Sequence, residues 1–214
     1  MKTSLAAAVL LVVLAPALAA CGGDDGPTTA QDPAASTSEV PAAPIAVPAA
    51  TGPVRSRWLP TVMGTGDGPE LCLGAIAESY PPQCGGPAVA GWDWQDHAPY
   101  AEQQGRVRWG TFAVTGTWDG TTFTVTEAVP GALYDPAPEE PVVLPTPSRE
   151  DSPAELEVIA TEAGEVLPGA QGAYADQEGH VLVDVTYDDG SLQDHADARW
   201  GAGVVVVSGA LVDA

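Results

Sequence analysis

Alternating apolar and polar residues predict that the first folded part of the chain is built from β-strands. The stretches 70–79 and 88–94 each alternate well enough for a half-buried strand, and a Tyr-Pro-Pro turn cluster separates them. Residues 106–129 form two arms rich in Thr, Val, Phe and Trp around an Asp-Gly pair, the strongest two-residue signal for a hairpin turn. About four or five short, glycine-rich strands predict a small all-β module over residues 54–133 that resembles a barrel of the OB type.

The period of the apolar positions changes to that of a helix after residue 151. A serine, a proline and a glutamate open this segment as a helix start, and apolar residues recur at helical spacing from Leu156 to Ala163. We therefore predict an α+β fold class, in which the β module is followed by a small unit similar to an α/β sandwich over residues 152–214. Its expected elements are a helix over 152–164, one long strand or a strand pair over 172–187, a second helix capped by Ser191, and a final strand over 203–212 buried on both faces.

Residues 1–20 have the pattern of an export signal. Lys2 gives a short charged start, an apolar run follows from Leu5 to Ala15, and small residues precede Cys21. That run is too short to span a hydrocarbon core of ~30 Å as a helix. One interpretation is an ordinary signal peptide cut elsewhere, with the cysteine incidental.

The four residues Leu18–Cys21 match the lipobox of bacterial lipoproteins residue by residue, so the chain resembles that class. The resemblance implies cleavage before Cys21 and a diacylglycerol on its thiol, with palmitate among the attached fatty acids. It implies a protein held by lipid on the extracytoplasmic face of the cell membrane.

Two further segments have the composition of connectors. Residues 21–53 are mostly Ala, Pro, Thr, Ser, Gly and Asp with no aromatic residue, so we expect a disordered tether that reaches roughly 30 Å from the membrane. Residues 134–151 are rich in proline and acids, and we interpret them as a linker between the two modules.

The charge of the chain limits its partners. The sequence has 29 acids and 7 basic residues, a net charge of −22 that loss of Lys2 with the signal peptide would make more negative. A chain without a basic patch is a poor nucleic-acid binder and is not drawn to anionic lipid, so the lipid on Cys21 would be the membrane attachment. The acidity favours solubility, and a divalent or basic partner is the alternative interpretation.

Cys72 and Cys84 are the two thiols left once Cys21 carries lipid, and an exported protein lies in an oxidising compartment. A zinc site needs four ligands with close pairs, whereas these cysteines are twelve positions apart and His97 stands alone. No CxxC motif is present, and no histidine is at a spacing that marks a base for a cysteine nucleophile. We predict a Cys72–Cys84 disulfide, worth ~3 kcal/mol by the entropy of its loop.

Aromatic and acidic residues mark a candidate binding site in the β module. Two tryptophans two positions apart would share one face of a strand, where they either stack on a sugar or a peptide or fill the core. Aspartates and a histidine follow them directly. The candidate ligand-binding residues are Trp92, Asp93, Trp94, Asp96 and His97.

We predict no catalytic residue, no metal site and no cofactor. Ser191, Asp194 and His195 lie close in sequence, but no GxSxG elbow accompanies them. Asp188 and Asp189 begin a turn that lacks the later glutamate of an EF-hand. Both sets are explained by a helix start and a solvated face.

The runs 71–94 and 109–125 resemble a group of secreted or lipid-anchored actinobacterial proteins of unknown function, and 187–205 is similar to their C-terminal part. The resemblance implies an exported fold and no particular activity. We therefore expect a binding or structural role at the cell envelope, with an envelope protein or polymer as partner. The alternative is a small hydrolase of envelope polymers that would use Asp93, Asp96 and His97.

Changing Cys21 to Ala should move the chain from the membrane fraction to the soluble extracytoplasmic fraction and abolish its labelling by fatty acids. The physical reason is that the acyl chains on this thiol would be the only strong membrane anchor, and more than one chain is needed for stable attachment. Cell fractionation and metabolic labelling measure both effects. Continued labelling of the variant would contradict the lipobox interpretation.

Overall fold

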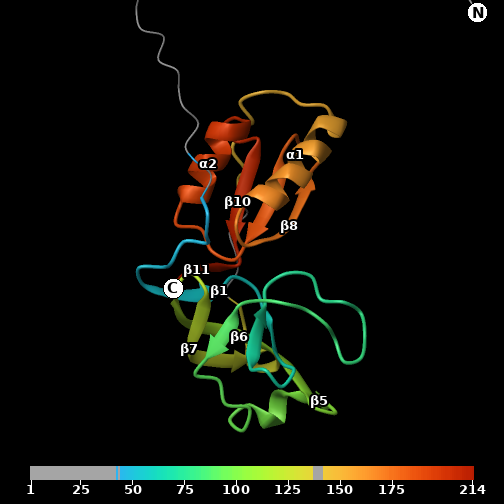
Figure 1. Cartoon of the computed structure of the whole chain (residues 1–214), viewed down its shortest axis with the longest axis vertical. Coiled ribbons are helices and arrows are strands. Elements are labelled where there is room, and N and C mark those ends of the chain that lie inside the picture. The colour runs from blue at the N-terminus through green and yellow to red at the C-terminus, as the bar shows by residue number, and fades with distance from the viewer. Residues whose placement is uncertain (1–41, 43, 137–141) are drawn as a thin grey trace, which may run out of the picture. The chain divides into compact units, whose positions relative to one another are not determined.

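In this computed structural model, residues 42, 44–136 and 142–214 are described, and they form an α+β fold in which strands predominate (Figure 1). The expected signal peptide (1–20), the lipid-bearing Cys21 and most of the tether (21–53) lie outside the described residues. The elements are β1 (Pro53–Ser56), β2 (Thr61–Gly64), β3 (Pro69–Cys72), β4 (Ala88–Ala90), η1 (Ala98–Tyr100), β5 (Glu102–Gln104), β6 (Val107–Trp118), β7 (Thr122–Pro130), η2 (Gly131–Leu133), α1 (Pro153–Val166), β8 (Ala170–Ala175), β9 (Val181–Val185), α2 (Ser191–Trp200), β10 (Val205–Gly209) and β11 (Leu211–Asp213).

Five strands of the larger sheet pair in a closed ring, which we call the β-ring. The antiparallel pairs are β2–β3, β3–β4, β6–β7 and β2–β6, and the parallel pair β4–β7 closes the ring. The long strand β6 also pairs with β1 and β5 outside the ring. Its alternate residues Phe112 and Val114 are buried inside, where they join a core with Val62, Leu71 and Phe123.

The hairpin predicted over residues 106–129 is confirmed. β6 and β7 pair from Trp118 and Phe123 outwards, with a bulge after Thr115. The carboxylate of Asp119 accepts hydrogen bonds from the backbone N–H of Thr121 at 2.9 Å and of Thr122 at 2.7 Å, and these bonds lower the pKa of Asp119. The turn therefore uses the aspartate as an acceptor for its own backbone, which is why Asp-Gly is a strong hairpin signal.

The two strands predicted before this hairpin are shorter than expected. The first ends at Cys72, and the residues after it form an irregular loop closed by an isolated bridge between Ala77 and Gln83. The second ends at Ala90 because Gly91 takes a positive φ of 75°, which turns the chain. The prediction that Trp92 and Trp94 share the face of a strand is therefore wrong.

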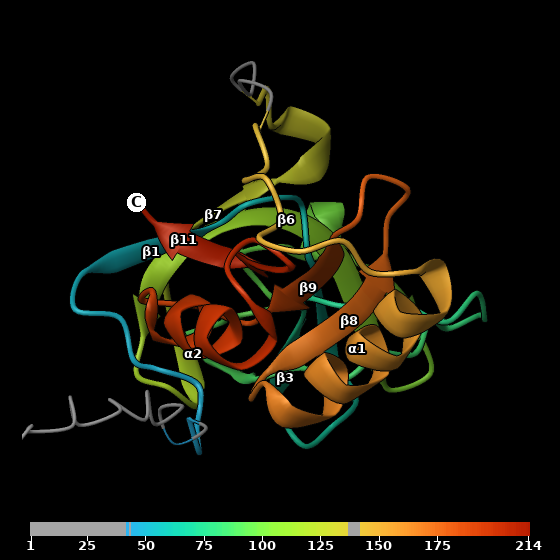
Figure 2. The same ribbon diagram turned by 90° about the horizontal axis from the view of Figure 1, so that it is seen from above.

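The C-terminal elements follow the predicted order of helix, strand pair, helix and strand. α1 begins with the predicted capping box, and its buried residues Leu156, Ile159, Ala160 and Ala163 are those of the predicted apolar face. β8 and β9 are antiparallel, β10 is parallel to β9, and α2 is the crossover between them. Figure 2 shows the two helices next to this sheet, and Arg199 of α2 pairs with Glu162 of α1. No helix of the described residues is long and apolar enough to cross a membrane.

The final strand predicted over 203–212 is in fact two strands in different sheets. β10 ends at Gly209, and the backbone N–H of Ala210 still donates to the Val185 carbonyl at 2.8 Å. The chain then leaves the small sheet, and β11 pairs antiparallel with β1 of the larger sheet. Tyr187, two residues after β9, packs in the core of the larger sheet, where its hydroxyl donates to Asp213 at 3.0 Å. The prediction of one strand is wrong because local sequence does not show that the partner sheet changes at Ala210.

Asp188, rather than Ser191, caps the start of α2. One carboxylate oxygen of Asp188 accepts from the backbone N–H of Leu192 at 3.0 Å, and the other accepts from that of Gln193 at 3.4 Å. Ser191 is exposed and is already the first helical residue. The predicted helix is therefore present, but its predicted cap is wrong.

Changing Asp188 to Ala should lower the free energy of unfolding by about 1 kcal/mol, because it leaves helix N–H groups without their acceptor. The matched control is Ser191→Ala, which should change stability by less than about 0.5 kcal/mol at this exposed position. Urea denaturation of both variants measures the difference. A larger loss for Ser191→Ala than for Asp188→Ala would contradict the assignment of the cap.

Candidate functional site: an aromatic cleft beside β6

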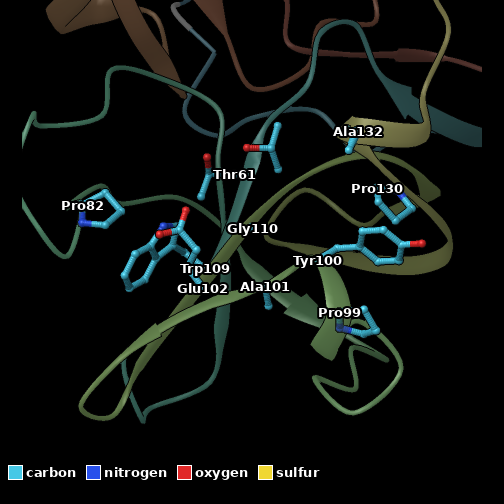
Figure 3. A pocket seen from close by; sticks show the side chains of 12 residues that line it. Thr61, Pro82, Pro99, Tyr100, Ala101, Glu102, Trp109, Gly110, Pro130 and Ala132 are labelled. Carbon is cyan, nitrogen blue, oxygen red and sulfur yellow. The ribbon is translucent and has the colours of Figure 1, made fainter.

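A cleft of about 610 Å³ lies beside β6, and we call it the aromatic cleft. Figure 3 shows Trp109 and Pro82 on one side of it and Tyr100 and Pro130 on the other. The full lining is Thr61, Pro82, Pro99, Tyr100, Ala101, Glu102, Trp109, Gly110, Thr111, Pro130, Gly131 and Ala132.

One wall of the aromatic cleft is held by the disulfide. The Cys72–Cys84 bond predicted from the sequence is confirmed, with the two Cα atoms 5.8 Å apart. It fixes the loop that carries Tyr80 and Pro82, and the Tyr80 ring lies edge-on to Trp109 with centroids 5.5 Å apart. Trp109 packs on Met63 and Cys72 and is only 8% exposed. The wall is therefore rigid and apolar.

The opposite wall is carried by η1. Tyr100 is 43% exposed, so its ring is available to a ligand. The Tyr100 carbonyl approaches β6 at Gly110, where a Cβ atom would lie only 2.9 Å from the carbonyl oxygen. Such a Cβ atom would also lie 2.7 Å from the Phe112 ring, so the glycine is what allows η1 and this core ring to approach β6 so closely.

The polar groups of the aromatic cleft are few. Glu102 is the one carboxylate in its lining, and Thr61, Tyr100 and Thr111 add hydroxyl groups. Flat aromatic faces with a few hydroxyl and carboxylate groups suit a ring that is apolar on its faces and polar at its edge. Hydrolysis of a glycosidic bond uses two carboxyl groups ~5–10 Å apart, and this lining supplies one.

The structure separates the five candidate residues chosen from the sequence. Trp92 stacks on His97 with ring centroids 4.1 Å apart, and both rings contact Phe112 of the core. The indole N–H of Trp92 is buried with no hydrogen-bond acceptor among the described residues. Trp92 and His97 therefore extend the core of the β-ring.

Asp93 and Asp96 are exposed, and neither belongs to the lining of the aromatic cleft. The carboxylate of Asp93 accepts from the backbone N–H of Gln95 at 2.8 Å, so it stabilises its own turn. Trp94 contacts Trp92 edge-on and lines two smaller cavities at one end of the β-ring. None of the five candidate residues lines the aromatic cleft.

Sequence reasoning missed Tyr100, Glu102 and Trp109. One signal for Trp109 was available, because alternation along β6 places it on the opposite face from Phe112, where it joins a separate small cluster with Met63 and Cys72. The approach of η1 and of the disulfide loop to that face depends on pairings between distant segments. No local pattern could have shown it.

Among the described residues, one group of side chains could hold a metal ion, and it lies in the turn between β8 and β9. Its members are Asp176, Glu178 and His180. His180 is buried, and each ring nitrogen lies 2.9 Å from an oxygen acceptor, Nδ1 from the Asp176 carboxylate and Nε2 from the Pro145 carbonyl. Both nitrogens must carry a proton to donate both bonds, and an imidazolium is not a metal ligand. The group therefore ties the linker residue Pro145 to the β8–β9 hairpin.

The protonation of His180 should make stability depend on pH. Burial lowers the pKa of His180, but the hydrogen bonds to Pro145 and Asp176 and the nearby carboxylates outweigh it, so the pKa is raised above its ordinary value of 6.5. A raised pKa in the folded state stabilises the fold fully below pH 6.5 and loses this effect as pH rises through the raised value.

The free energy of unfolding of the unchanged chain should therefore fall, relative to His180→Gln, as the pH rises above about 6.5. His97→Gln is the control, because His97 makes ring contacts and no ion pair. Urea denaturation across this range measures the effect. Parallel stability curves for the unchanged chain and His180→Gln would contradict the imidazolium assignment.

Comparison with protein-family models, with curated proteins and with solved structures finds no match to this chain.

Proposed function

We propose that this protein is a lipid-anchored envelope protein that binds a glycan segment of the cell envelope in the aromatic cleft. The observation that carries the proposal is the cleft itself, with Tyr100 and Trp109 on opposite sides and with Glu102, Thr61 and Thr111 in its lining. The lipobox at Leu18–Cys21 supports the location. A tether of some thirty residues would let the cleft reach polymer roughly 30 Å from the membrane.

We further propose that the β-ring is a barrel of the OB type. In chain order its strands are β2, β3, β4, β6 and β7, and the third and fifth of them are the parallel pair that closes the ring. OB barrels are five-stranded and bind oligosaccharides or oligonucleotides. The net charge of −22 favours an oligosaccharide, because phosphate backbones are repelled by such a chain.

The dimensions and chemistry of the cleft suit one or two sugar rings. A volume of about 610 Å³ is in the range of small-molecule sites. Sugar rings have apolar C–H faces that stack on aromatic rings, and their hydroxyl groups donate to carboxylates such as that of Glu102. The prolines at three points of the lining keep the cleft open without adding hydrogen-bonding groups that would need a partner.

A small hydrolase of envelope polymers is the second candidate. The exposed carboxylate of Glu102 favours it, since a general acid or base must lie in the substrate cleft. Binding accounts better for the lining, which carries a single carboxyl group.

Changing Tyr100 to Ala should weaken binding to purified peptidoglycan sacculi about tenfold, the value of one lost aromatic stacking contact. The matched control is Tyr174→Ala, because Tyr174 is an exposed tyrosine on β8, outside the cleft. Co-sedimentation of the mature chain with sacculi gives the affinities. Equal binding by all three chains, or no binding by the unchanged chain, would contradict the proposal.

The same samples separate binding from hydrolysis. A binding protein leaves the sacculi intact, and Glu102→Gln then changes affinity only. Release of soluble sugar fragments that stops in Glu102→Gln, at unchanged stability, would support the hydrolase instead.

A further inference from the structure

A second cavity, of about 360 Å³, lies at the end of the β-ring where β2 turns into β3. We call it the arginine pocket. It shares no lining residue with the aromatic cleft, and a smaller cavity of about 210 Å³ adjoins it through Trp94, Gln103 and Arg108. Its lining is Gly64, Gly66, Gly68, Pro69, Trp94, Gln103, Arg106 and Arg108.

Each of the four polar side chains that line the arginine pocket carries hydrogen-bond donors, and the other four lining residues are glycines and a proline. The two guanidinium groups, the Trp94 indole N–H and the Gln103 amide all donate, and no carboxylate is among the lining residues. The chain has 29 acids and 7 basic residues, so a pocket of this size without an acid is unexpected from composition. Glu102 borders the smaller adjoining cavity, and Asp67 stands in the chain between two glycines of the lining without lining the pocket itself.

Two arginines of the described residues pair with a carboxylate, and neither of them lines the arginine pocket. Arg149 pairs with Asp151, and Arg199 pairs with Glu162. Neither Arg106 nor Arg108 makes an ion pair within the described ranges 44–136 and 142–214. Arg106 and Arg108 are two like charges two positions apart, and they repel each other. A bound anion would offset this electrostatic repulsion.

The orientation of Arg108 is already set. Its Nε–H donates to the Gln103 side-chain oxygen at 3.1 Å, across the β5–β6 pair in which these residues are direct partners. This bond uses the one acceptor of the Gln103 side chain and leaves the two terminal amino groups of Arg108 for a ligand. A guanidinium held in this way is pre-organised for a phosphate or carboxylate.

Trp94 forms a second fixed side of the pocket. Its indole lies against Gly64, where a Cβ atom would come within 2.9 Å of the indole nitrogen. The glycine therefore allows the indole to pack flat against the end of β2. The indole also contacts Trp92, which stacks on His97 and lies edge-on to Phe112 of the core. The pocket thus has a rigid aromatic side next to two cations.

We propose that the arginine pocket binds a single compact oxyanion, the phosphate or the carboxylate group of a small molecule or of the end of a polymer. Charge-assisted hydrogen bonds from Arg106 and Arg108 hold the anion, and the Trp94 indole N–H adds a third donor. The net charge of −22 disfavours an extended polyanion, because only the group inside the pocket would meet positive charge.

Titration of the full mature chain with inorganic phosphate in one arm and glucuronate in the other tests the proposal and distinguishes the two sources of the oxyanion. The ionic strength is kept constant with sodium chloride. NMR resonances of the Trp94 indole N–H and the Arg108 Nε–H report binding at the pocket. We expect saturable shifts of both resonances with at least one probe, and the tighter probe identifies the anion class.

Arg106→Gln and Arg108→Gln should each weaken this binding about tenfold or more, the value of a charge-assisted hydrogen bond. Arg55→Gln is the matched control, since Arg55 is an exposed arginine on β1 that lines neither cavity, and the same charge is removed. It should leave the affinity unchanged. Arg108→Gln also removes the hydrogen bond to Gln103 and could disturb β5. Arg106 makes no hydrogen bond within the described part of the chain, so a loss of affinity in Arg106→Gln reports anion binding alone.

Two results would overturn the proposal. The first is the absence of a saturable shift with both probes. The second is an equal loss of affinity in Arg55→Gln and in the two pocket variants, which would mean that the anions respond only to total charge. Neither result bears on the aromatic cleft, whose lining is separate.

Discussion

Strand β6 is the constraint on which the rest of the structure depends. Its 12 residues pair with β1, β2, β5 and β7. Pairing with β2 and β7 builds the ring, pairing with β5 adds an edge strand, and pairing with β1 connects the ring to β11. Alternation along it then assigns roles. Phe112 and Val114 face the core, Trp109 faces the aromatic cleft, and Arg108 lies near the end of the ring with the arginine pocket. A shift of register by one residue would exchange these faces and remove both cavities together.

The role of each charged residue depends on where it lies in the fold, and the net charge of the chain does not show it. Acids outnumber basic residues by 29 to 7, yet the carboxylates that the structure describes in most detail serve the backbone. Asp119 closes the β6–β7 turn, Asp188 caps α2 and Asp93 closes a turn after β4. Such acids are explained by folding and carry no information about a ligand. The informative charges are Arg106 and Arg108, because these two arginines, unpaired within the described residues, line one cavity that has no carboxylate in its lining.

The C-terminal elements are joined to the larger sheet through three contacts that connect distant segments. β11 pairs with β1, Tyr187 enters the core of the larger sheet, and the Arg57 N–H donates to the Ala210 carbonyl at 2.9 Å. Within the C-terminal elements, His180 bonds the linker at Pro145, so that described parts of the linker also pack in place. The two regions predicted as separate modules thus share strand pairing.

The sequence by itself determined the elements that local chemistry specifies. Asp119 and Gly120 determined the hairpin, Ser152 and Glu155 determined the start of α1, and Cys72 and Cys84 determined their bond once the compartment was inferred. It did not determine what happens where distant segments meet. The turn at Gly91 takes Trp92 and Trp94 off their strand, Ala210 moves the chain from one sheet to the other, and η1 brings Tyr100 over Gly110. These outcomes depend on which surfaces pack together, and packing energies between distant residues leave no periodic signal in the sequence. The tertiary structure alone therefore decided which aromatic residues line a cleft and which fill the core.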